Sequence, residues 1–171
     1  MTWEDNMKLI MENWRKHVLE QSYMKGTGVQ YTALVLDDPA ALVSNLKEQG
    51  VEIPEEWLGL DLPLEEKLPH HKKNEDLPHH MTILSPRDQK IRYPSELLNQ
   101  PGGATVTGWA IDDRVLAVTV KTDLPTKQDI PHITIALSPT GKASDSNDLL
   151  ASGAPNKLNQ FPVSGSIKEI T

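Results

Sequence analysis

Two stretches of the chain repeat the same alternation of polar and apolar residues, and both patterns predict β-strands. Residues 80–83 read His-Met-Thr-Ile, residues 132–135 read His-Ile-Thr-Ile, and each run is soon followed by Ser-Pro, at residues 85–86 and 138–139. Side chains two apart on a strand project to one face, roughly 6–7 Å apart along it. We therefore expect each strand to present an imidazole and a hydroxyl on one face and apolar side chains on the other.

The first part of the chain has the pattern of a helix, a strand and a second helix. Apolar residues spaced three to four apart predict an amphipathic helix over residues 3–24, which a lysine and two glycines then close. Residues 29–36 are mostly β-branched, aromatic or apolar, which predicts a buried strand. Asp38 caps the next helix, which begins at Pro39 and ends at Gly50.

The middle of the chain is rich in proline and charge. Residues 51–79 predict a long loop with one short helical turn over residues 54–57. Within this loop, His70-His71-Lys72-Lys73 forms either a flexible flap near the site or an ordinary solvated surface.

The remainder of the chain predicts mainly strands. The clearest hairpin joins residues 104–111 to residues 114–121 through Asp112-Asp113. A polar connector leads to the strand that begins at His132, and a short helix over residues 147–150 precedes a last strand over residues 161–170. The expected fold class is α+β.

Composition narrows the range of functions. The 171 residues carry a net charge of −7 and no cysteine, and their mean hydropathy is −0.44. A disulfide framework and a cysteine nucleophile are excluded, and no apolar run is long enough to span a membrane. The negative net charge disfavours long nucleic acid as a partner, since neutralising its phosphates requires clustered Lys and Arg. We expect a cytoplasmic protein, although a nuclear or virus-encoded one would have the same composition.

Paired His and Thr residues suggest acid–base chemistry on a phosphate. One imidazole can act as general base while the other acts as general acid, and Thr hydroxyls can donate to phosphate oxygens. A Ser-His-Asp triad is disfavoured because the chain has no G-x-S-x-G sequence. No carboxylate accompanies the His residues in either run, so we expect no metal. A rival hypothesis is a metal site built from the four histidines His70, His71, His79 and His80.

The two H-x-T runs resemble those of the 2H phosphoesterase superfamily, which includes 2′-5′ RNA ligases of the LigT type and cyclic nucleotide phosphodiesterases. The order of the predicted elements over residues 29–171 is also similar. This resemblance implies a bilobal fold of two small antiparallel sheets that face a central cleft. Residues 1–28 would then be an N-terminal helical extension of a domain that spans residues 29–171.

The resemblance also implies roles for the residues of the two motifs. His80 and His132 would be catalytic, and Thr82 and Thr134 would bind phosphate. His79 has the wrong spacing to Thr82 and should point to the opposite face from His80. Which of the two motif histidines acts as the base is left open.

The implied activity is that of a phosphodiesterase that needs no metal or other cofactor. Its substrates would be 2′-5′ or cyclic phosphate linkages in small nucleotides, short oligonucleotide signals or RNA ends. The alternative is a nucleotide- or RNA-binding module that keeps the cleft without turnover.

Further residues are candidates for contacts with the substrate. Tyr93, Trp109 and Trp57 could stack on a base, and each could equally be a packing residue. Lys142 and the pair Ser146-Asn147 follow the second motif and could approach the ligand.

Overall fold

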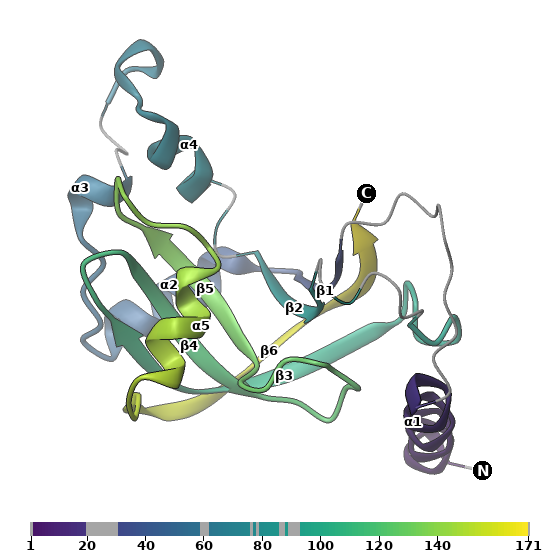
Figure 1. The fold of residues 1–171 in the computed structure, drawn as a ribbon. Helices are drawn as coiled ribbons and strands as arrows, with labels where there is room; N and C mark the ends of the chain where they lie inside the picture. The colour runs from purple at the N-terminus through teal and green to yellow at the C-terminus, as the bar shows by residue number, and fades with distance from the viewer. Residues whose placement is uncertain are drawn as a thin grey trace.

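The computed structural model has one antiparallel sheet, with short helices towards one side of it and a longer N-terminal helix at the other end (Figure 1). It describes residues 2–19, 31–58, 62–75, 77, 79–85, 88 and 93–170, with side chains in the first helix up to residue 13. The elements, in chain order, are α1 Trp3–Leu19, β1 Tyr31–Leu36, α2 Pro39–Glu48, α3 Glu55–Leu58, the 3-10 helix η1 Leu64–Glu66, α4 Pro69–Glu75, β2 His80–Leu84, β3 Pro101–Ile111, β4 Val115–Lys121, β5 His132–Leu137, α5 Asp145–Ala151 and β6 Asn156–Ile170.

The six strands are hydrogen-bonded in the order β2-β1-β6-β3-β4-β5. The expectation of a mixed helix and sheet fold is confirmed. The expected pair of small separate sheets is corrected to one continuous sheet, because the long strands β3 and β6 pair with each other from Pro101–Ser166 to Trp109–Asn156. The two edge strands β2 and β5 also contact each other, so the sheet nearly closes on itself.

Two glycines let the backbone pack closely where the sheet and its loops require it. A Cβ at Gly165 of β6 would lie 2.1 Å from the Val35 carbonyl oxygen of β1, and a Cβ at Gly141 would lie 1.9 Å from the Arg114 carbonyl oxygen. Both distances are below any real Cβ contact, so only glycine fits at these positions. Gly141 thereby fixes the turn between β5 and α5.

Several predicted elements agree with the structure. Asp38 caps α2 by accepting a hydrogen bond from the Ala41 N–H (3.0 Å), and Pro39 is its first residue. The hairpin through Asp112-Asp113 is confirmed as β3 and β4, and the short helix before the last strand as α5. Residues 29 and 30 of the first predicted strand, and residues 20–24 of the first helix, lie outside the described residues.

The predicted loop over residues 51–79 is the main error in the secondary structure. The turn at residues 54–57 is confirmed as α3, but residues 69–75 form the helix α4 rather than a flap. The side chain of Asn74 explains this helix. Its amide nitrogen donates to the carbonyls of Trp57 (2.6 Å) and Leu137 (2.8 Å), and its oxygen accepts from the Leu137 N–H (2.6 Å). These long-range bonds anchor α4 to the end of β5.

The hydrophobic core receives side chains from all six strands of the sheet. It contains the alternate residues of the strands together with one face of α2, and its fully buried members include Leu34, Leu46, Ile83, Val118 and Ile133. Figure 1 shows α2 to α5 gathered towards the β4–β5 side and α1 at the other end of the molecule. Among the described helices, none is long and apolar enough to cross a membrane.

Candidate active site

The first H-x-T run forms β2, and strand alternation separates its polar and apolar residues. His80 pairs with Val35 of β1, and Thr82 pairs with Ala33. Between them, Met81 is fully buried and belongs to the hydrophobic core. His80 and Thr82 therefore share the face of the sheet opposite to the core, as the two-residue spacing predicts.

The second run repeats this arrangement in β5. His132 pairs with Thr119 of β4, and Thr134 pairs with Ala117. Ile133 points to the hydrophobic core and is fully buried. The same periodicity thus places the second His and Thr on the face away from the core.

Long-range contacts bring the two runs together at the closing edge of the sheet. The connector between β4 and β5 reaches β2 at the Ile83 carbonyl, which accepts from the Thr126 hydroxyl (2.9 Å) and from the Lys127 N–H (3.1 Å). The positive charge of a protonated His132 lies close enough to lower the pKa of His80. The imidazoles of the two motifs are therefore electrostatic neighbours.

His80 lies in an environment that disfavours its charged form. Burial lowers its pKa to about 4, and the neighbouring His79 and His132 act in the same direction. Its ring lies 5.3 Å from the Tyr31 ring and 4.7 Å from the His79 ring, centroid to centroid. Among the described residues, nothing hydrogen-bonds to its buried Nδ1 atom. His80 is thus neutral at pH 7.

The expectation for His79 requires correction. Its ring meets the His80 ring edge-on, at an interplanar angle of 79°, instead of pointing away on the opposite face. The reason is that β2 begins at His80, so the alternation of a strand does not apply to the residue before it. The His79 carbonyl accepts from the Leu36 N–H (2.7 Å), which holds this residue beside β1.

A hydrogen bond to a nearby backbone carbonyl orients the imidazole of His132. Its Nδ1–H donates to the Ile130 carbonyl (2.8 Å), because a carbonyl oxygen can only accept. This bond leaves Nε2 as the nitrogen available to a ligand. Burial lowers the pKa of His132, while the Ile130 carbonyl opposes that change by stabilising the imidazolium. His132 therefore has support for a proton that His80 lacks.

The hydroxyls of the two motifs also differ. The Thr134 hydroxyl lies 2.9 Å from the Ser146 hydroxyl of α5, whereas no side-chain partner of Thr82 occurs among the described residues. Ser146 was one of the candidates after the second motif, and the turn at Gly141 carries it back over β5. The second motif is thus the more firmly preorganised of the two.

The proposed base-stacking residues are placed differently from the expectation. Tyr93 is only 1% exposed and its hydroxyl donates to the Pro125 carbonyl (2.8 Å), so its ring is a core residue and is not free to stack on a base. Trp57 is likewise buried. Trp109 is partly buried against the core, and Lys142 is exposed just before α5.

The histidines of the rival metal hypothesis form two separate pairs. The rings of His70 and His71 lie 3.9 Å apart in α4, and those of His79 and His80 lie together at β2. His71 is engaged at both nitrogens, since Nδ1 accepts from the Leu68 N–H (3.1 Å) and Nε2 lies 3.1 Å from the Glu56 carbonyl. Within the described part of the chain, no three His, Asp or Glu side chains are grouped as metal ligands.

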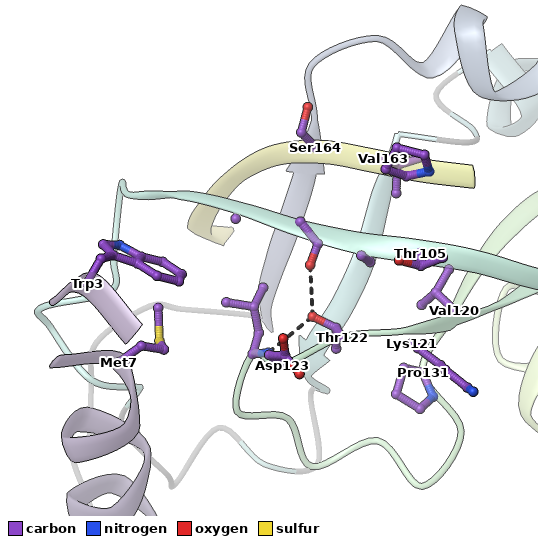
Figure 2. Close-up of a pocket in the computed structure, with 15 residues that line it drawn as sticks. Trp3, Met7, Thr105, Val120, Lys121, Thr122, Asp123, Pro131, Val163 and Ser164 are labelled. Carbon is purple, nitrogen blue, oxygen red and sulfur yellow. Dashed lines mark hydrogen bonds between the residues drawn. The ribbon is translucent and has the colours of Figure 1, made fainter. Parts of the chain in front are cut away.

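A pocket of about 850 Å³ lies at the α1 end of the molecule (Figure 2). Trp3 and Met7 of α1 form one wall, and β3, the end of β4 and β6 form the others. None of the four motif side chains lines it, and its link to them is Pro131, which precedes His132. The pocket is therefore distinct from the site on β2 and β5.

Comparison with known families supports the resemblance inferred from the motifs. Residues 104–167 match the model of the fungal tRNA ligase phosphodiesterase domain, which is a 2H phosphoesterase. The match includes His132 and Thr134 but begins after His80 and Thr82, and it spans less than half of the chain. No curated protein matches the sequence. The similarity to the 2H phosphoesterase superfamily is thereby confirmed.

Sequence reasoning missed three parts of this site. Tyr31 lies beside His80 because β1 pairs with β2, the Ile130 carbonyl fixes the tautomer of His132, and Thr126 ties the connector to β2. The alternation of the strand around Ala33 could have placed Tyr31 on the same face as His80, had the pairing been known. Nothing in the sequence marks Ile130 or Thr126.

Proposed function

We propose that this relative of the 2H phosphoesterases is a phosphodiesterase that opens cyclic phosphates at RNA ends or on small nucleotides. The observation that carries the proposal is the contact between β2 and β5, which brings His80 near enough to His132 for their charges to interact, each with a Thr two residues on along the same face. Two imidazoles and two hydroxyls are sufficient for acid–base catalysis on a phosphate, so the proposed mechanism needs no metal.

We assign His80 as the general base and His132 as the general acid. His80 is neutral at pH 7 because burial and its histidine neighbours depress its pKa, so its ring can accept a proton from water. His132 can carry a proton on Nε2 while its Nδ1–H remains bonded to Ile130. The negative charge of a bound phosphodiester would raise the pKa of both imidazoles and assist the acid most.

Bond making and bond breaking balance at the phosphorus atom. The oxygen of water bonds to phosphorus while His80 takes its proton. The bond from phosphorus to a ribose oxygen breaks, and that oxygen takes the proton of His132. The products are a phosphate monoester and a free hydroxyl, and solvent returns each imidazole to its starting state. Thr82 and Thr134 would donate to the non-bridging oxygens.

We infer the substrate class from the matching family and from the net charge of the chain. The matching family is the phosphodiesterase domain of a tRNA ligase, which favours an RNA end that bears a cyclic phosphate. The net charge of −7 favours a short oligonucleotide or nucleotide over a long nucleic acid. Lys142, which follows the second motif in the chain, and Trp109 of β3 are proposed as substrate contacts. We place catalysis in residues 29–171, with residues 1–28 as an extension, and the protein in the cytoplasm.

A panel of substrates tests the proposal. Product release is measured with 2′,3′-cyclic AMP, a short RNA ending in a 2′,3′-cyclic phosphate, 2′-5′ oligoadenylate and cyclic dinucleotides, each with and without EDTA. We expect turnover of the cyclic phosphates that EDTA does not change. Binding to these ligands without turnover would favour the alternative, a non-catalytic binding module. Activity that EDTA abolishes and zinc restores would overturn the proposed mechanism.

A further inference from the structure

A hydroxyl of β5 and a hydroxyl of α5, those of Thr134 and Ser146, form a hydrogen bond whose direction matters for the site. Ser146 is fully buried, and its hydroxyl lies 2.9 Å from that of Thr134, which is partly exposed. Either oxygen could donate to the other. In each arrangement one hydroxyl donates its proton within the pair, and the proton of the other hydroxyl needs a different acceptor.

Burial decides between the two arrangements. If Thr134 donated, the proton of the Ser146 hydroxyl would need another acceptor, and no second partner for this hydroxyl occurs among the described residues. A buried donor without an acceptor is unfavourable, because it gives up its hydrogen bond to water and gains none in return. If Ser146 donates, its proton is satisfied and Thr134 keeps its own proton for a ligand on the exposed side.

We infer that Ser146 is a positioning residue that fixes the Thr134 hydroxyl as a donor towards a phosphate oxygen. The inference rests on the proposed function and deepens it, because it assigns a residue that acts through Thr134 and does not itself touch the substrate. It also explains an asymmetry of the site. Thr82 has no such partner in the described part of the chain, so its hydroxyl can rotate, whereas that of Thr134 is oriented before the phosphate arrives.

The chain between β5 and α5 is built to hold this serine in place. Gly141 packs against the Arg114 carbonyl, where no Cβ fits. Asp145 accepts from the Lys142 N–H (2.8 Å) and from the Arg114 guanidinium (3.4 Å), which ties the start of α5 to the end of the β3–β4 hairpin. Leu150 is buried on the same helix. Ser146 is therefore fixed by contacts on both sides of it.

The test is a double-mutant cycle with Ser146→Ala and Thr134→Val. We expect S146A alone to lower kcat/KM for 2′,3′-cyclic AMP roughly fivefold to tenfold, the effect of one hydrogen bond. In the T134V background, S146A should cause no further loss. A merely structural role of Ser146 would lower activity by the same factor in both backgrounds, and that result would overturn the inference.

Matched controls separate this effect from a loss of packing. Ser138 is also buried at the end of β5, but its hydroxyl pairs with that of Thr140 (3.3 Å), so S138A should leave kcat/KM unchanged. If S146A fails to fold, Ser146→Cys takes its place, since a thiol fills the space but donates weakly.

Binding of inorganic phosphate distinguishes the failure of this inference from that of the proposed function. Titration calorimetry should show severalfold weaker phosphate binding by S146A than by the unmodified protein, whether or not any substrate is turned over. Equal phosphate affinities would overturn the role of Ser146 even if catalysis is confirmed. Weaker binding without turnover by the unmodified protein would retain the Ser146 role and reject only the phosphodiesterase activity.

Discussion

At the scale of single residues, the two motifs have the same sequence pattern but different surroundings. His132 is fixed through Nδ1 by the Ile130 carbonyl, while the buried Nδ1 of His80 has no hydrogen-bond partner among the described residues. The His80 ring instead contacts the rings of Tyr31 and His79. The desolvated, unsupported imidazole is the better candidate for a base that stays neutral, and the supported one for an acid.

Replacing either motif histidine should abolish most of the activity while the fold survives. We expect His80→Ala and His132→Ala each to lower kcat by roughly a hundredfold or more, the usual scale for one acid–base group. Steady-state kinetics on 2′,3′-cyclic AMP, with circular dichroism as the check on folding, measures both effects. His71→Ala changes a histidine outside the site and is the control. Near-full activity in either motif variant would contradict the assigned roles.

The assigned roles also predict the pH profile of kcat/KM, which reports groups of the free enzyme. Activity should rise with pH as His80 loses its proton, at about pH 4, its folded pKa. It should fall again as His132 loses its proton, and burial lowers the pKa of His132 below the ordinary value near 6.5. The optimum should therefore lie on the acid side of neutrality. An optimum above pH 7 would contradict the assignment of base and acid.

At the scale of elements, the connector between β4 and β5 is what joins the two motifs. Thr126 both donates to the Ile83 carbonyl (2.9 Å) and accepts from the Gln128 N–H (3.1 Å), so it holds the connector against β2. Tyr93 reaches the same connector at the Pro125 carbonyl. These contacts support the alignment of His80 with His132, because β2 and β5 contact each other without a ladder of backbone hydrogen bonds.

Thr126→Val tests this connection, and Thr122→Val is its matched control. Thr122 makes the same two kinds of bond, since it donates to the Gly103 carbonyl (2.9 Å) and accepts from the Leu124 N–H (3.1 Å). These bonds join the end of β4 to β3 and do not reach β2, as Figure 2 shows for the residues around Thr122. Both variants should lose about 1 kcal/mol of unfolding free energy in urea. Only T126V should also lower kcat/KM severalfold. An equal loss of activity in both variants would show that the connector does not align the site.

The pairing of β1 with β6 should be sensitive to a single methyl group. In Gly165→Ala, the new Cβ would lie 2.1 Å from the Val35 carbonyl oxygen, and backbone cannot yield as a flexible side chain can. We expect a loss of roughly 2–4 kcal/mol of unfolding free energy, measured in urea. Gly153→Ala, where the new Cβ would meet no atom within 4 Å, should change stability little. Equal stabilities would show that the strands can separate without cost.

At the scale of the whole molecule, stability and the active site are linked through the buried histidines. The pKa of His80 in the folded protein is about 4, below its ordinary value near 6.5, and burial also lowers the pKa of His132 and His70. Between about pH 4 and pH 6.5, His80 is more often protonated in the unfolded chain than in the folded protein. Stability is therefore present above pH 6.5 and is lost as the pH falls towards 4.

Thermal unfolding at pH 7 and at pH 5 measures this linkage. The melting temperature of the unmodified protein should be lower at pH 5. In His80→Asn, which titrates at neither pH, the difference between the two melting temperatures should be smaller. An unchanged difference would assign the pH dependence to groups other than His80.

The sequence by itself determined the local features of this protein. A two-residue alternation is enough to place His80 with Thr82, and His132 with Thr134, because successive side chains on any strand point to opposite faces. The cap of α2, the β3–β4 hairpin and α5 are likewise encoded by a few neighbouring residues. These local rules also carried the resemblance to the 2H phosphoesterases, which the family match supports.

Only the tertiary structure decided how these features combine. The single sheet with β3 paired to β6, the helix α4 held by Asn74, and the burial of Tyr93 all depend on residues far apart in the chain. Periodicity contains no information about which strands pair or which carbonyl a distant hydroxyl reaches. The same is true of Ser146 and Ile130, whose partners give the two motifs different chemistry. That difference arises from packing, because each motif is surrounded by atoms that its own sequence does not specify.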